Sequence, residues 1–227
     1  EYFANGYSLS SSQGGGSLEK GREVFISYGP RSNDALLQQY GFVEPDNVHD
    51  VYVMPPLREW NIAALEEATG RTFQPGRLQK LERAGLLGGK SLGSNSDGDD
   101  DVFEEGVANR GRGVVVTRAA GLDPAIITAL RVLVSSEDEW NAVGEAVGNL
   151  VTENSGGQQN ERLAIVAAQR ALELELESKE TTLEQDEETW KNRASLGMNT
   201  HEMLALQFRI EKKKLLKETI FALSLKS

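Results

Sequence analysis

The most specific chemical pattern in the sequence is a pair of aromatic–glycine steps near its beginning. The segment Glu23–Ser27 is typical of a strand and ends in Tyr28, which a glycine follows; Tyr40-Gly41-Phe42 comes after a short helical stretch. A tyrosine hydroxyl in such a place can orient a reacting group, so that catalysis depends on positioning and electrostatics. The alternatives are a strand-end aromatic for Tyr28 and core packing for Tyr40 and Phe42.

Other kinds of reactive site are disfavoured. The chain has no cysteine, which excludes disulfides, thiolate zinc sites and cysteine nucleophiles. Gly88–Ser91 resembles part of a phosphate-binding loop, but Ala84 stands where that loop requires its first glycine. Asp97–Asp101 has the opening spacing of a calcium-binding EF-hand loop, but Val102 and Ala108 occupy its glycine and glutamate positions.

The dense pattern from Gly21 to Val43, with Ile-Ser-Tyr-Gly at residues 26–29, resembles the C-terminal end of a SET domain. The match is to the Rubisco large-subunit lysine methyltransferase type. The resemblance implies that Tyr28 is the catalytic tyrosine at the mouth of the lysine channel, where it orients the ε-amine for methyl transfer. It also implies that Tyr40 and Phe42 line that channel or the adenosine side of the cofactor site.

The same resemblance implies S-adenosylmethionine as the cofactor. The family binds it through a glycine-containing segment and an Asn-His motif, both before the Ile-Ser-Tyr-Gly strand. The two histidines, His49 and His201, follow Val48 and Thr200, and both lie after Tyr28. We therefore expect the main cofactor site to lie outside this chain, which would be the C-terminal part of a longer polypeptide and inactive alone.

The last third of the sequence predicts a long helical hairpin built from residues 160–178, 181–193 and 200–223. Three stretches in it, 160–163, 181–187 and 205–213, resemble the helical substrate-binding lobe of the same family. The partner implied is a protein that presents a lysine. The apolar spacing predicts one buried stripe on the first helix (Leu163, Val166, Ala167, Arg170, Leu174) and another on the last (Leu204, Phe208, Ile210, Leu215, Ile220).

A run of three lysines, Lys212–Lys214, interrupts the last of these stripes. Our interpretation is a solvated helix face, with docking of a partner as the alternative.

We predict an α+β fold. Residues 1–54 would be a short β-containing remnant of a SET domain, and residues 55–227 a mostly α-helical substrate-binding lobe with a disordered insertion at about 88–101. The predicted strands are 48–54 and 113–117, and the further helices are 34–39, 57–70, 75–84, 124–134 and 138–150.

Charge and hydropathy limit the possible partners. With 35 acidic and 24 basic residues the net charge is −11, which disfavours nucleic acid and is compatible with a basic protein substrate. An ordinary acidic surface is the alternative explanation. No apolar stretch reaches the roughly 18 residues of a membrane span, so we expect no membrane association. Oligomeric state stays open, as does the choice of chloroplast, cytoplasm or nucleus.

The function we predict is the C-terminal part of an S-adenosylmethionine-dependent protein-lysine N-methyltransferase, with the helical lobe binding the protein substrate. The alternative is a non-catalytic protein-binding module from a truncated or split SET protein. An Asn-His motif in the transcript upstream of this chain would distinguish the two.

Overall fold

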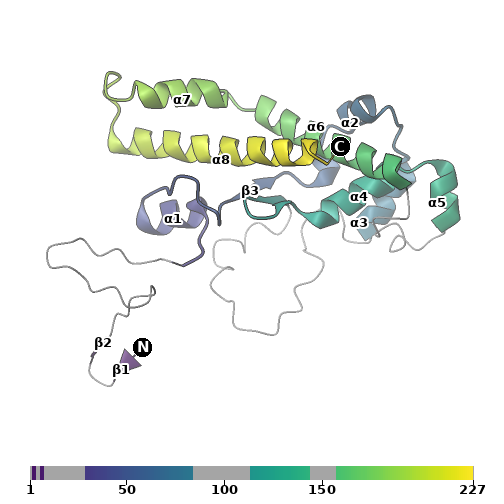
Figure 1. The fold of residues 1–227 in the computed structure, drawn as a ribbon, viewed down its shortest axis with the longest axis horizontal. Coiled ribbons are helices and arrows are strands. Elements are labelled where there is room, and N and C mark those ends of the chain that lie inside the picture. The colour runs from purple at the N-terminus through teal and green to yellow at the C-terminus, as the bar shows by residue number, and fades with distance from the viewer. Residues whose placement is uncertain (1, 4–5, 8–28, 84–112, 144–156, 227) are drawn as a thin grey trace.

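The computed structural model describes residues 2–3, 6–7, 29–83, 113–143 and 157–226. Most of these residues are helical, and a small antiparallel sheet completes the fold, which confirms the predicted α+β class (Figure 1). The predicted insertion at about 88–101 lies outside the described residues, as do the two rejected motifs there. Tyr28 lies outside them as well.

The described residues form two small sheets and a succession of helices. The strands are β1 (Tyr2–Phe3), β2 (Gly6–Tyr7), β3 (Val51–Met54), β4 (Val114–Thr117) and β5 (Gly121–Leu122). The helices are α1 (Asn33–Tyr40), the 3-10 turn η1 (Leu57–Glu59), α2 (Ile62–Thr69), α3 (Pro75–Arg83), α4 (Pro124–Val134), α5 (Glu137–Val143), α6 (Gly157–Glu177), α7 (Leu183–Lys191) and α8 (Thr200–Ser224).

The three-stranded sheet has the order β3-β4-β5 and is antiparallel throughout, with Tyr52 opposite Val116. The strand predicted at 48–54 begins only at residue 51. Residues 47–50 form a turn instead, in which the backbone N–H of Asp50 donates to the Asn47 carbonyl at 3.0 Å. The sheet joins β3 to β4 across the predicted boundary at 54/55, and that boundary stays a prediction.

Capping residues fix where several of the helices begin or end. Ser32 accepts a hydrogen bond from the Ala35 N–H and caps α1, and Gly41 ends this helix with φ 74°. The helix predicted at 57–70 is instead two elements. The Asn61 side chain accepts a hydrogen bond from Ala64 and starts α2 anew after η1. Helix α4 has the predicted bounds, with Asp123 as its cap.

Helix α8 is the central element of the helical lobe. Figure 1 shows α6 and α7 in a row beside α8, which runs back along both, as the predicted hairpin requires. Helix α8 contacts α6, α7, β3, β4 and β5. Leu206, Leu215 and Leu216 are therefore buried on it, whereas Leu204, Phe208 and Ile220 of the predicted stripe are only partly buried.

The stripe predicted on α6 is right for Ala167, which is buried, and for Leu163, which packs against the core, but not for its other three residues. The buried residues of this helix are mostly small (Ala164, Ile165, Ala167, Ala168, Ala171, Leu172), whereas Val166, Arg170 and Leu174 are only partly buried. Alanines let the backbones of α2 and α4 approach α6, and both helices contact it. A stripe drawn mainly through the larger side chains therefore missed most of the packed face.

Candidate functional site

Of the three predicted site residues, Tyr40 and Phe42 lie within the described part of the chain. They flank the glycine that ends α1, and their ring centroids are 6.4 Å apart. The Tyr40 residue is 42% exposed, and the Arg31 guanidinium lies 5.8 Å from its ring centroid. The two rings thus form an open aromatic surface at the end of α1, rather than part of the core.

Two of the three lysines in the run on α8 are buried. The Lys212 and Lys213 side chains are 8% and 6% exposed, so the predicted solvated face is wrong for both; Lys214 is 30% exposed. Three consecutive helical residues span about 200° of the circumference. On a helix with neighbours on several sides, some of them must therefore point inward.

Lys212 ties the N-terminal segment to α8. Its ammonium group lies 2.6 Å from the Asp34 carboxylate, 2.7 Å from Asp50 and 2.7 Å from the Val51 carbonyl. Asp50 is fully buried and also accepts the Asn33 backbone N–H at 2.9 Å. A buried ammonium with two carboxylates and a carbonyl is a satisfied ion, and it holds α1, the 47–50 turn and β3 against α8.

Lys213 makes the corresponding contact to the other side of α8. Its ammonium group lies 2.6 Å from the buried Asp186 carboxylate on α7, which also accepts from Arg209 at 2.9 Å and from the Thr181 hydroxyl at 2.8 Å. Burial alone would raise the pKa of Asp186. The hydrogen bonds from Lys213 and Thr181 and the charges of Arg209 and Lys213 outweigh it, and the pKa lies below its usual value.

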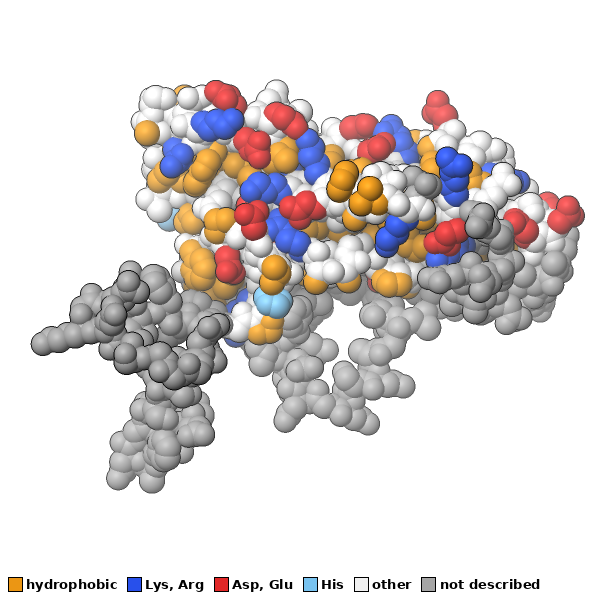
Figure 2. All heavy atoms as spheres, viewed as in Figure 1, with side chains coloured by type: hydrophobic (Ala, Val, Ile, Leu, Met, Phe, Trp, Pro, Cys, Tyr) orange, Lys and Arg blue, Asp and Glu red, His pale blue; other side chains and the backbone are white. Residues whose placement is uncertain are grey.

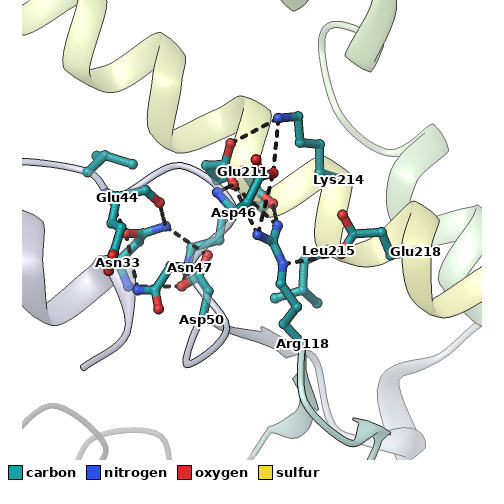
Figure 3. A network of polar contacts seen from close by, with 12 residues as sticks. Asn33, Glu44, Asp46, Asn47, Asp50, Arg118, Glu211, Lys214, Leu215 and Glu218 are labelled. Carbon is teal, nitrogen blue, oxygen red and sulfur yellow. Dashed lines mark hydrogen bonds and ion pairs between the residues drawn. The ribbon is translucent and has the colours of Figure 1, made fainter. Parts of the chain in front are cut away.

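A third group of ions surrounds Glu211, which is buried (Figure 3). Its carboxylate accepts from Arg118 at 3.3 Å, from the Asp46 backbone N–H at 2.8 Å and from Lys214 at 3.2 Å. Arg118 also lies 3.2 Å from Glu218. The end of β4 and the loop after α1 are thereby joined to α8.

A pocket of about 330 Å³ opens between α8, β3 and the α6–α7 connection. We call it the α8 pocket. Its lining residues are Tyr52, Lys179, Glu180, Thr181, Phe208, Arg209, Lys212, Lys213 and Leu216. The Phe208 ring is partly exposed and has the Lys212 ammonium 4.8 Å from its centroid. The aromatic side chain predicted to be core is therefore part of a pocket wall.

Tyr52 also lines the pocket and is held by polar contacts. Its hydroxyl donates to Glu175 at 2.5 Å, and Lys179 donates to the same carboxylate at 2.5 Å. Burial, together with the hydrogen bond and charge of Glu175, raises the pKa of Tyr52 to about 12. At neutral pH the side chain is therefore a protonated, fixed aromatic wall.

A larger groove of about 900 Å³ lies between α4, α6, the end of α8 and the β4–β5 turn. Neither this groove nor the α8 pocket is lined by Tyr40 or Phe42. Within the described ranges, no group of three metal-ligating side chains occurs, and no helix could cross a membrane. Figure 2 shows acidic and basic side chains interspersed over one face, without a patch of a single sign.

The sequence reasoning missed Tyr52, Asp50 and Asp186 as partners of the helical lobe. The sequence does contain one signal that Lys212 is buried. Lys212 precedes the apolar Leu216 by four residues, so both lie on the same side of the helix. No comparable local pattern marks Asp50 or Asp186, because their partners lie 162 and 27 residues away.

Comparison with known families places most of the helical lobe in a described family. A family model described as Rubisco LSMT substrate-binding matches residues 71–216. The matched range runs from just before α3 to the buried Leu216 of α8 and excludes residues 21–43, on which the SET resemblance rests. No curated protein matches the chain.

Proposed function

The chain belongs to the Rubisco LSMT substrate-binding family, and from this premise we propose that its helical lobe binds the protein substrate of a protein-lysine N-methyltransferase. The observation that carries the proposal is the family match over residues 71–216. These residues include α4, α6, α7 and most of α8, together with the α6–α7 connection that lines the α8 pocket.

The catalytic half of the proposal rests on the resemblance of residues 21–43 to the end of a SET domain. In this proposal, Tyr28 orients the ε-amine of the substrate lysine by a hydrogen bond. Bound S-adenosylmethionine would supply the methyl group. Tyr40 and Phe42, as an open aromatic surface, fit the edge of a channel or of an adenosine site better than an enclosed interior.

The test is methyl transfer by the full-length product of the gene that encodes this chain. The protein is incubated with S-adenosylmethionine labelled on its methyl group and with proteins from its source cells, and the label is mapped to residues. We expect label on lysine. Tyr28→Phe should lower turnover by on the order of 10²-fold, because positioning is lost, with little change in thermal stability.

Two results would count against this proposal. Unchanged turnover in Tyr28→Phe would make Tyr28 a packing residue. Absence of lysine labelling by the full-length protein would favour the second candidate, a non-catalytic protein-binding module, for which the same family match over 71–216 is the supporting observation.

A further inference from the structure

We propose that the α8 pocket binds an apolar side chain of the substrate protein, and that this side chain lies in a basic segment. The inference rests on the proposed function, since it assumes that the helical lobe binds a protein. It adds the location of the binding site on the lobe and the chemistry that the bound segment must have.

The walls of the pocket favour an apolar group. Tyr52 and Phe208 present aromatic rings from two different elements, and Leu216 lies at the same pocket. Folding leaves Phe208 partly exposed in the middle of α8, on the side of the helix away from the buried Leu206 and Ile210. A volume of about 330 Å³ suits one or two side chains and lies at the small end of ligand sites.

The cations of the pocket do not favour an acidic ligand, because each is already paired. Lys212 binds Asp34 and Asp50, and Lys213 binds Asp186. Arg209 also binds Asp186, and Lys179 binds Glu175. Lys212 and Lys213 are buried, so an incoming carboxylate would have to displace one of their partners. Arg209 is half exposed and keeps further N–H donors; apart from it, the pocket offers its rings and aliphatic lysine stems rather than spare positive charge.

The surface beside the pocket, on the second half of α6 and on α7, carries an excess of acidic side chains. Residues 170–191 contain eight acidic and three basic side chains, and five of the eight are in ion pairs (Glu173, Glu175, Glu177, Glu184, Asp186). Glu180 lines the pocket and is exposed, and it has no side-chain partner among the residues that the structure describes. Such a rim attracts lysine or arginine on either side of the anchored residue, which raises the association rate and excludes acidic segments.

The pocket is formed before binding. Tyr52 is on a strand and fixed by Glu175, and Phe208 is on a long helix that contacts five other elements. Little ordering is therefore needed when a ligand enters, and truncating one wall should remove a large part of the binding free energy.

The test begins with the full chain and a phage-displayed library of random dodecapeptides. We expect the enriched peptides to carry a large apolar residue with lysine or arginine nearby. Enrichment of acidic peptides, or of none, would overturn the proposal. The tightest peptide is then labelled, and its dissociation constant is measured by fluorescence anisotropy.

Two pairs of variants locate the binding. Phe208→Ala should weaken the peptide by about tenfold or more, whereas Phe221→Ala, on the same helix but 65% exposed and outside the pocket, should not. Glu180→Lys should weaken peptide binding and reduce the salt dependence of the dissociation constant, whereas Glu82→Lys on α3 should change neither. Circular dichroism confirms that the variants are folded. Equal binding by Phe208→Ala and Phe221→Ala would contradict the proposal.

Failure of this proposal is distinguishable from failure of the proposed function. If the full-length protein methylates lysine and Phe208→Ala leaves the KM for that protein unchanged, the α8 pocket is not the anchoring site, and the function stands. If peptides bind at the pocket and no lysine is methylated, the anchoring site stands, and the catalytic assignment fails.

Discussion

The neighbouring residues Lys212 and Lys214 have the same side chain and very different surroundings. Lys212 is buried against Asp34 and Asp50, whereas Lys214 is partly exposed beside Asp46 and Glu211. Removing one partner of a buried ion pair leaves an uncompensated charge, which costs about 3–5 kcal/mol. Glu211 is buried too, but without Lys214 it keeps Arg118 and the Asp46 N–H, so the loss of the partly exposed lysine should cost about 1 kcal/mol or less.

Lys212→Met should therefore lower the free energy of unfolding by several kcal/mol, and Lys214→Met should lower it by about 1 kcal/mol or less. Urea unfolding of the full chain, followed by circular dichroism, measures both. Similar losses in the two variants would mean that the contacts of Lys212 do not hold α1 and β3 against α8.

The lowered pKa of Asp186 predicts how the stability of the fold depends on pH. Because its pKa in the folded protein lies below the unfolded value near 3.8, it stabilises the fold above that value, and this contribution is lost as the pH falls through the folded pKa. The free energy of unfolding should therefore decrease as the pH is lowered below about 4.

The variant Asp186→Asn should be less stable at neutral pH, by about 3–5 kcal/mol, because Lys213 loses its buried partner. Its stability should also depend less on pH in that acidic range. Asp138→Asn, exposed on α5, is the control and should keep the wild-type profile. An unchanged acid profile in Asp186→Asn would show that other carboxylates cause the acid loss.

At the scale of the element, the packing of α8 decides which side chains matter for stability. Leu216 and Phe208 both line the α8 pocket, but Leu216 is fully buried and belongs to the core, whereas Phe208 is partly exposed. Leu216→Ala should cost about 2–5 kcal/mol, and Phe208→Ala distinctly less, although phenylalanine is the larger residue. Urea unfolding of both variants tests the order, and the reverse order would restore Phe208 to the core.

The elements themselves were largely predictable. Helix α4 has its predicted bounds because Asp123 and Pro124 fix its start, and the helices that became α6, α7 and α8 were all expected at nearly the observed places. Local signals failed where tertiary contacts decide. Examples are the two-residue strand β5, which exists only through its pairing with β4, and the α6 face, which packs through alanines.

The candidate site was less predictable than the fold. Tyr40 and Phe42 belong to a local sequence pattern, whereas the α8 pocket brings β3 together with the α6–α7 connection and α8, which follow it by more than 100 residues. Sequence spacing cannot show that Phe208 and Tyr52 share a pocket. The lysine run was visible, but its partners Asp50 and Asp186 follow only from the arrangement of the three elements.

At the scale of the whole molecule, α8 connects the parts to which we assign different roles. On one side Lys212 holds the segment that carries Tyr40 and Phe42, and on the other Lys213 holds the α6–α7 connection beside the α8 pocket. Figure 1 shows α8 lying between α7 and the α1–β3 region. Residues of a catalytic segment and a substrate-binding lobe would thus be fixed to one rigid helix.

The central claim is that the helical lobe binds the protein that is methylated. Hydrogen exchange of the full-length protein, with and without that protein, tests it most directly. We predict slower exchange on binding in the connection between α6 and α7 and in the middle of α8, because bound surfaces open less often. Protection confined to segments outside residues 71–216 would contradict the claim.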